Sequence, residues 1–305
     1  MLRQRVPSAI VMTLGLLGVM WLDHALAARF RLPGLVLLLG LLVPAAWLAS
    51  REIGVLMHAV GIGAGPRGRV IFVGAVAGLA IGLWKLIVGW LKVMVPQMGG
   101  LYWNDFTLAL LIPGLAAVLL GWLVLHLLRR ERSAAGAIHL LSALAVGFVF
   151  VGLLMSSWLW VRVFLEPWGL AAAVMVIKSC DIGAYFTGRF AGRHKLIVWL
   201  SPGKTWEGLA GGLVVAAAVC LVVEPLLTPA ESAAWPWWYC LMAGALLGYV
   251  GQLGDLFASA LKRDAGVKDF ARTIPGFGGV MDVIDSLLLA GPVVLGLVWL
   301  GGWFG

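Results

Sequence analysis

The chain has 305 residues, of which 62% are apolar and 12% are charged. Because a water-soluble domain carries roughly 25% charged residues, and the mean hydropathy here is +1.01, the composition excludes an ordinary soluble globular protein. The net charge of +8 is typical of the topology signals of a membrane protein and of its attraction to anionic headgroups. It does not come with the interleaved basic and aromatic pattern of a nucleic-acid surface.

Apolar runs long enough to cross a hydrocarbon core recur from one end of the chain to the other. Because backbone polar groups cannot stay unpaired in lipid, each run is predicted to be a helix. The first run is interpreted as a retained span rather than a signal peptide, since further spans follow it. The nine predicted spans cover residues 8–27, 33–50, 69–90, 105–127, 137–158, 168–188, 206–226, 237–262 and 281–302. The sequence therefore predicts an all-α, polytopic transmembrane protein.

The positions of Lys and Arg orient these spans, because cytoplasmic loops carry an excess of basic residues. Most of the basic residues fall in one set of alternate loops, which includes residues 51–69, 129–132, 189–204 and 262–272. The N-terminus is therefore predicted to be cytoplasmic and the C-terminus to lie outside. The two most polar loops, before the seventh and ninth spans, are predicted to face the cytoplasm.

Charged side chains within apolar spans are costly, so they are candidates for function. At the end of the sixth predicted span, Lys178, Asp181 and Tyr185 have the spacing that places them on one helical face. A neutralised structural ion pair and a polar site both explain this cluster.

The segment from Ser201 to Gly208, Ser-Pro-Gly-Lys-Thr-Trp-Glu-Gly, precedes the seventh span. Its Gly-Lys-Thr is similar to the tail of a phosphate-binding loop, but Val198 replaces the first glycine and no strand is predicted before it. Ser201 or Thr205 is expected to cap the helix, whose N-terminus together with Lys204 suits an anion. A plain capped helix start explains the segment equally well.

The strongest cluster lies on the last two spans. A polar stripe on the eighth span consists of Gln252, Asp255, Ser259 and Lys262, spaced three or four residues apart. Asp282 and Asp285 share a face at the start of the ninth span, after a glycine-rich turn. Carboxylates on two such faces suit Mg²⁺, which prefers oxygen ligands and keeps waters for substrate phosphates. The nearby basic residues Lys262, Arg263 and Lys268 suit the phosphates themselves.

Three ordered blocks of this sequence resemble those of the phosphatidate cytidylyltransferases, also called CDP-diacylglycerol synthases. The blocks are Asp181-Ile-Gly-Ala-Tyr185, the segment from Ser201 to Gly208, and the run from Ser259 to Asp285 that contains Ile-Pro-Gly-Phe-Gly-Gly-Val-Met-Asp-Val-Ile-Asp. The similarity covers residues 175–292, whereas the first 170 residues match only in hydropathy and approximate span count.

The resemblance implies a nucleotidyltransferase of phospholipid biosynthesis, in which the phosphate of phosphatidic acid attacks the α-phosphorus of CTP and releases pyrophosphate. It implies catalytic roles for Asp255, Asp282 and Lys262, and a Mg²⁺ ion held by Asp255, Asp282 and Asp285. The residues that it implies for substrate binding are Asp181, Ser201, Lys204, Ser259, Arg263 and Lys268.

The resemblance also implies a place in a bacterial inner membrane, with the active site facing the cytoplasm, where CTP meets phosphatidic acid among the membrane lipids. No nucleic-acid partner is expected, and a homodimer is one option for the assembly. Residues 1–170 are expected to serve as scaffold, in oligomerisation or in lipid entry. Residues 171–305 are expected to form the catalytic transmembrane region.

Two residues depart from the family pattern, because Phe277 stands where it usually has His and Val283 where it usually has Arg. The carboxylates and lysines are intact, so activity is expected to persist, while the lost groups bear on substrate identity and rate. A CTP-dependent transferase or kinase acting on a polyprenol or ether lipid is an alternative. A transporter is a third hypothesis, but the sequence lacks the paired repeats that are typical of transporters, and its polar clusters occupy one half of the chain.

Overall fold

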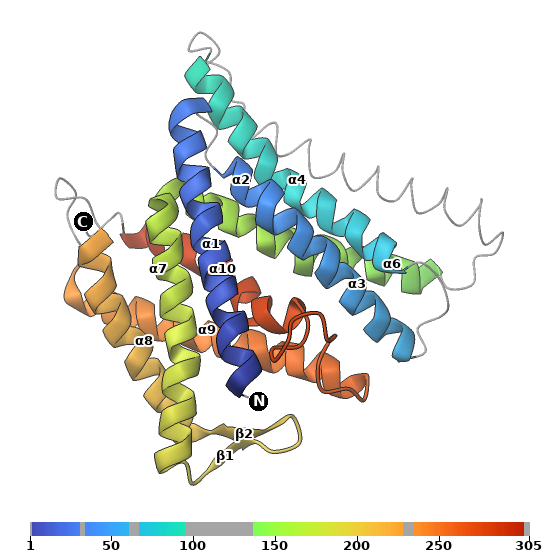
Figure 1. Cartoon of the computed structure of the whole chain (residues 1–305), viewed down its shortest axis with the longest axis vertical. Helices are drawn as coiled ribbons and strands as arrows, with labels where there is room; N and C mark the ends of the chain where they lie inside the picture. Colours follow the sequence, from blue (N-terminus) through green and yellow to red (C-terminus); the bar gives the residue numbers. More distant parts are fainter. Residues whose placement is uncertain (1, 31–33, 61–66, 95–136, 228–234, 302–305) are drawn as a thin grey trace. The chain divides into compact units, whose positions relative to one another are not determined.

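The computed structural model describes residues 2–30, 34–60, 67–94, 137–227 and 235–301, so the predicted span 105–127 lies outside the described residues. Helices dominate these ranges (Figure 1). Six helical segments in the described part of the chain are long and apolar enough to cross a membrane. The prediction of an all-α, polytopic membrane protein is thereby confirmed, whereas nine spans and their orientation remain predictions.

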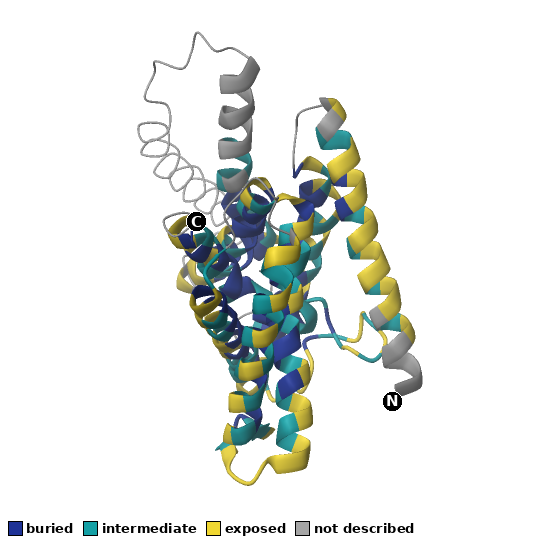
Figure 2. Cartoon of the chain, turned by 90° about the vertical axis from the view of Figure 1, so that its left-hand side faces the viewer, coloured by how far each residue is buried: buried dark blue, intermediate teal, exposed yellow. Residues whose placement is uncertain are grey.

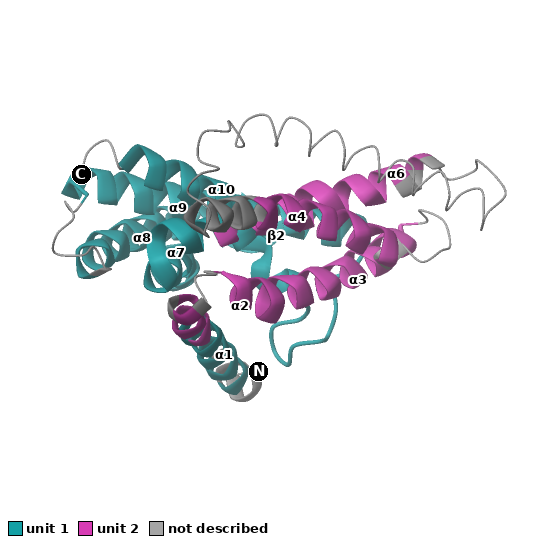
Figure 3. Ribbon diagram, turned by 90° about the horizontal axis from the view of Figure 1, so that it is seen from above, with its two compact units in different colours: residues 1–21, 160–305 teal, residues 22–159 magenta. Residues whose placement is uncertain are grey.

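The chain divides into two compact units (Figure 3). The first combines Met1–Trp21 with Trp160–Gly305, and the second is Leu22–Leu159. Every candidate site residue named above belongs to the first unit. The first unit therefore contains the whole candidate site, and the second is described only for its own packing.

Helix α1 (Leu2–Phe30) leads into the second unit, where its Asp23 is buried. The Asp23 carboxylate accepts hydrogen bonds from the backbone N–H groups of Gly34, Val36 and Leu37, at 2.9–3.2 Å. It thus satisfies donors that a helix N-terminus leaves unpaired. The other elements among the described residues of this unit are α2 (Leu35–Leu37), the π-helical η1 (Leu38–Leu42), α3 (Val43–Ala59), α4 (Arg67–Met94), α6 (Ala137–Ala145) and the π-helical η4 (Val146–Leu153).

Helix α7 (Leu154–Ala191) enters the first unit and contains one break. Glu166 has φ 61° and ψ 173°, and Pro167 follows it. Proline has no N–H and disfavours a helical conformation in the residue before it, so the helix stops and restarts there. The sequence predicted a connection over residues 159–167, but the chain is helical on both sides of this single break. Two expected spans thus form one kinked element.

A β-hairpin joins α7 to α8 (Trp206–Leu227), as Figure 1 shows. Its strands β1 (Lys195–Ile197) and β2 (Ser201–Thr205) are antiparallel. The sequence predicted a loop here with no preceding strand, and both expectations are wrong. The Gly-Lys-Thr residues belong to β2 itself, so the segment is not a phosphate-binding loop between a strand and a helix.

Helix α9 (Trp237–Asp264) packs against both α8 and α10 (Met281–Gly301). Small residues allow the close approach: a Cβ on Gly244 of α9 would lie 2.7 Å from the Cα of Ala217 on α8. Between α9 and α10, the Tyr239 hydroxyl donates to the Leu297 carbonyl at 2.5 Å. Figure 2 shows that the buried residues lie mostly where helices face one another, whereas exposed residues lie on their outward faces.

Candidate active site

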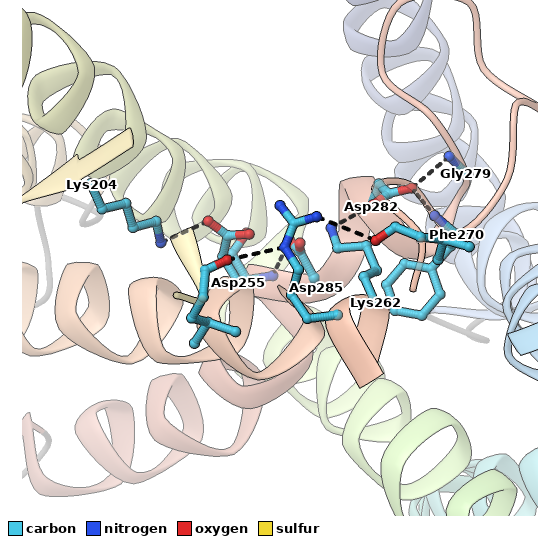
Figure 4. A network of polar contacts seen from close by, with 11 residues as sticks. Lys204, Asp255, Lys262, Phe270, Gly279, Asp282 and Asp285 are labelled. Atoms are coloured by element: carbon cyan, nitrogen blue, oxygen red, sulfur yellow. Dashed lines mark hydrogen bonds and ion pairs between the residues drawn. The ribbon is translucent and has the colours of Figure 1, made fainter. Parts of the chain in front are cut away.

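Charged side chains from α7, β2, α9 and α10 converge in the first unit, and Figure 4 shows their central part. The acidic members are Asp181, Asp255, Asp282 and Asp285. The basic members are Lys178, Lys204 and Lys262. If all of these groups are ionised, the cluster keeps one negative charge in excess.

Asp255 links α9 to the hairpin. Its Oδ2 lies 2.7 Å from the Nζ of Lys204 on β2. The Lys204 Nζ is buried, and within the described residues it makes no hydrogen bond of good alignment. Its ammonium protons therefore remain suited to another acceptor, such as a phosphate oxygen.

Asp282 is held by three donors. Its Oδ1 lies 2.7 Å from Lys262 Nζ, and its Oδ2 accepts the backbone N–H groups of Gly279 at 2.8 Å and Phe270 at 2.9 Å. The side chains of Lys262 and Asp282 are only 12% and 7% exposed. This buried ion pair therefore ties α9 to the first turn of α10, and the two N–H groups tie the preceding loop to the same carboxylate.

The glycine-rich turn is shaped around Asp282. Gly278 has φ +102°, which side chains rarely adopt, and a Cβ there would lie 2.7 Å from Asp282 Oδ2. Glycine is thus required both by the backbone conformation and by the approach of the carboxylate. The neighbouring Phe277, the departure from the family's usual His, is exposed in this turn.

Lys178 crosses from α7 to α10. Its Nζ donates to the Ser286 hydroxyl at 2.6 Å and to the Val283 carbonyl at 3.1 Å, and it lies 3.6 Å from Asp181. Since Val283 contributes its backbone, the side-chain change at this position leaves the contact in place. Asp285 interacts electrostatically with Asp255, Lys178 and Lys262. These contacts join the separate pairs into one network.

Three members of the network were not among the assigned site residues, namely Lys178, Gln252 and Ser286. Gln252 Nε2 donates to Asp181 Oδ1 at 2.7 Å, which joins α9 to α7. Lys178 and Gln252 could have been assigned to the site from the sequence, because each is spaced to share a helical face with a nearby carboxylate. Ser286 carried no signal beyond its place next to Asp285.

The remaining predicted site residues are Ser201, Ser259, Arg263 and Lys268, and they differ in exposure and in contacts. Ser201 in β2 and Ser259 on α9 are half-buried. Arg263 donates through Nε to the Leu200 carbonyl at 3.3 Å and through Nη1 to the Val267 carbonyl at 3.4 Å. Exposed Lys268 lines a hollow of about 370 Å³ next to Arg272. The hairpin and the loop before α10 thus both contact the basic end of α9.

The expected helix cap is Thr205 rather than Ser201. Its Oγ1 accepts the N–H of Gly208 at 3.0 Å in the first turn of α8. Glu207 accepts the backbone N–H groups of Arg193 at 3.1 Å and His194 at 3.2 Å. The first turn of α8 therefore fixes the base of the hairpin.

The carboxylates of this site do not form a complete metal-binding cluster by themselves, but they meet the smaller requirement of Mg²⁺. No group of three His, Cys, Asp or Glu side chains in the described ranges is arranged around a common point for a metal ion. Mg²⁺, however, is usually bound by one or two carboxylates together with water and substrate phosphates. The neighbouring carboxylates of Asp255 and Asp285 meet that requirement.

Close packing of α9 on α10 holds these two carboxylates together, which yields a first prediction. A Cβ on Gly254 would lie 3.1 Å from the Ser286 Cα and nearer still to the Asp285 carbonyl oxygen. We expect Gly254→Ala to lower the free energy of unfolding by about 1–3 kcal/mol, as overpacking does. Thermal unfolding in detergent measures this change.

Gly296→Ala is the matched control, because nothing lies within 4 Å of a Cβ at that position of α10. Alanine in an open helical position is neutral or stabilising. Equal unfolding temperatures for the two variants would contradict the close approach of α9 and α10 at Gly254.

The apolar spans and the carboxylate–lysine network define a polytopic membrane protein with a charged cluster in its first unit. Compared with known families, the chain matches the sequence model of the Cytidylyltransferase family over residues 3–300. The chain belongs to this family. The resemblance in the three blocks is thereby confirmed and extends over the N-terminal half as well.

Individual relatives agree with the family. A phosphatidate cytidylyltransferase of Pseudomonas aeruginosa is 35% identical over 309 aligned residues, which cover 99% of each chain. A phosphatidate cytidylyltransferase of Staphylococcus saprophyticus is 35% identical over 208 residues, covering 68% of this chain and 75% of the relative. The uncharacterised protein YnbB of Escherichia coli is 37% identical over 165 residues, or 52% of this chain and 54% of that protein.

Proposed function

We propose that this chain is a phosphatidate cytidylyltransferase that converts CTP and phosphatidic acid into CDP-diacylglycerol and pyrophosphate. The observation that carries the proposal is the network of Asp255, Asp285, Lys204 and Lys262, in a chain that aligns along 99% of its length with an enzyme of that name. The network supplies both charges that this reaction needs: carboxylates for a cation and ammonium groups for phosphates.

The reaction needs no side-chain nucleophile. An oxygen of the phosphatidic acid phosphate forms a bond to the α-phosphorus of CTP, and the bond from that phosphorus to the pyrophosphate oxygen breaks. The electron pair leaves with pyrophosphate. The protein therefore contributes positioning and neutralisation of negative charge, which are the main sources of catalysis in such transfers.

Lys204 and Lys262 supply neutralisation from opposite ends of the network. Each is paired with a carboxylate at 2.7 Å. A triphosphate brings several negative charges, so it competes with Asp255 and Asp282 for these ammonium groups. The poor alignment of the Lys204–Asp255 contact makes Lys204 the easier of the two to redirect.

Asp255 and Asp285 are the better supported ligands for Mg²⁺. Asp282 already accepts from Lys262 and two backbone N–H groups, so it is proposed as a ligand only if Lys262 turns to a phosphate. When bound, the ion supplies positive charge at the α-phosphate and the leaving pyrophosphate. Asp181, held by Lys178 and Gln252, supports the network from α7.

The proposal places the site at the cytoplasmic face of a bacterial inner membrane, on the basis of the basic loops before α8 and α10. Soluble CTP there meets a lipid headgroup presented by the inner leaflet. Arg263, Lys268, Ser201 and Ser259 are proposed to contact substrate phosphates. Residues 1–170 are proposed as scaffold, and a homodimer as one assembly.

The position of the label in CTP tests this reaction against a lipid kinase, the alternative within the same chemistry. With phosphatidic acid and Mg²⁺, purified protein in vesicles is expected to move label from the α-phosphate of CTP into lipid. Label at the γ-phosphate is expected in pyrophosphate. Transfer of the γ-label to a lipid alcohol, with no α-label in lipid, would contradict the proposal.

A further inference from the structure

We propose that the tip of the β1–β2 hairpin, Val198 and Trp199, inserts into the anionic headgroup layer of the same bilayer. The tip would thereby set the height of Lys204 and Arg263 relative to the lipid phosphates. The insertion stands on the structure of the hairpin alone. The effect on substrate rests on the proposed function.

The tip exposes two large apolar side chains. Trp199 is 77% exposed and Val198 is 64% exposed, while the next residue, Leu200, is buried. The hairpin thus uses Leu200 for its own packing and turns its largest side chain outward. A Trp side chain that is exposed to water to this degree contributes little burial of apolar surface. Trp is, however, enriched at membrane–water interfaces because its ring is amphipathic.

The charge around the tip matches an anionic surface. Residues 189–206 contain no Asp or Glu, and their basic residues are Arg189, Arg193, Lys195 and Lys204. Arg189, Arg193 and Lys195 are exposed. Each basic residue near an anionic bilayer contributes about 1 kcal/mol to attraction. A basic segment with an apolar tip therefore favours a lipid surface over an uncharged protein partner.

The position along the chain fixes the hairpin near the membrane surface. β1 starts four residues after the last residue of α7, and β2 runs directly into α8. Both helices are candidate membrane spans. Four residues reach about 14 Å at most when extended, so the strands cannot leave the vicinity of the span ends.

The hairpin connects its tip to the site through short contacts. The Leu200 carbonyl, adjacent to Trp199, accepts from Arg263 Nε at 3.3 Å, and Lys204 on β2 pairs with Asp255 at 2.7 Å. At its base, the Trp206 N–H donates to the His194 carbonyl at 3.0 Å. A displacement of the tip therefore moves groups that contact the site.

Spin labelling of Val198→Cys in vesicles that contain anionic lipid tests the insertion. The native thiols of Cys180, Cys220 and Cys240 are buried, so the new thiol is labelled selectively. We expect the nitroxide to be accessible to oxygen and shielded from a water-soluble nickel chelate. Asp264→Cys is the matched control, because Asp264 is exposed and follows Arg263, which contacts Leu200.

The control label is expected to be accessible to the nickel chelate. Equal chelate accessibility at the two positions would overturn the proposal, and it would mean that the tip lies in water. Shielding of the Val198→Cys label from both reagents would also overturn it, because the tip would then be covered by protein, such as a second copy of the chain.

Kinetics with mixed vesicles test the positioning. We expect Trp199→Ala to raise the KM for phosphatidic acid about tenfold, clearly more than it raises the KM for CTP, and Trp199→Phe to restore most of the loss. An unchanged KM for phosphatidic acid, or an equal loss for both substrates, would overturn the positioning role. If wild-type protein makes no CDP-diacylglycerol, the proposed function fails, while the labelling result still decides the insertion.

Discussion

Asp255→Asn is expected to lower the rate of CDP-diacylglycerol formation by about 10²–10³-fold, the scale of losing one preorganised electrostatic contact in an active site. Asparagine keeps the shape of the side chain but removes the charge that holds Lys204 at 2.7 Å. It also removes one of the two best supported carboxylates for Mg²⁺. The measurement is kcat in vesicles with saturating CTP, phosphatidic acid and Mg²⁺.

Asp264→Asn is the control for this variant. Asp264 is the last residue of α9 and is exposed, so its replacement is expected to change kcat by no more than about twofold. The unfolding temperature of both variants shows whether the fold is retained. Wild-type activity in a folded Asp255→Asn protein would remove Asp255 from the proposed site.

Lys262→Met is expected to reduce both stability and activity. It leaves the Asp282 carboxylate buried without its ammonium partner, and breaking a buried ion pair from one side costs about 3–5 kcal/mol. Denaturation in detergent measures the loss of stability, and the CTP assay measures the loss of activity. Lys268→Met is the control for the stability measurement alone, because Lys268 is exposed on the loop and its removal leaves this pair intact.

The double variant Lys262→Met, Asp282→Asn separates structure from chemistry. The uncompensated charge is gone, and an amide oxygen still accepts from the Gly279 and Phe270 N–H groups, so much of the lost stability is expected to return. Activity is expected to stay low, because the Lys262 ammonium group no longer faces the phosphates. Recovery of activity in the double variant would show that Lys262 serves only to neutralise Asp282.

The parts of the fold that follow from hydropathy were predictable. Helices cover residues 206–226, 237–262 and most of 281–302 as expected, because lipid forces apolar runs into helices. The polar stripe on α9 and the two aspartates on α10 were visible because charges are costly in such surroundings. Spacing alone showed that Gln252 and Asp255 share a face.

The partners of these residues were not predictable, because they depend on how helices pack. Nothing in the sequence around Lys204 indicates that it pairs with Asp255 on α9. Likewise, nothing around Lys178 indicates that it donates to Ser286 on α10. The hairpin was missed because strands of three and five residues carry too little periodicity. The break at Glu166 could have been predicted from the sequence, because Pro167 follows it.

Diffraction at the manganese absorption edge locates the cation most directly. Crystals would hold the full chain with Mn²⁺ in place of Mg²⁺ and a CTP analogue with a methylene group between the α- and β-phosphorus atoms. The expected result is an anomalous peak about 2.1 Å from oxygens of Asp255 and of the analogue's phosphates, with Asp285 alongside. A peak on the phosphates alone, with Asp255 still paired to Lys204, would contradict a metal site built by α9 and α10.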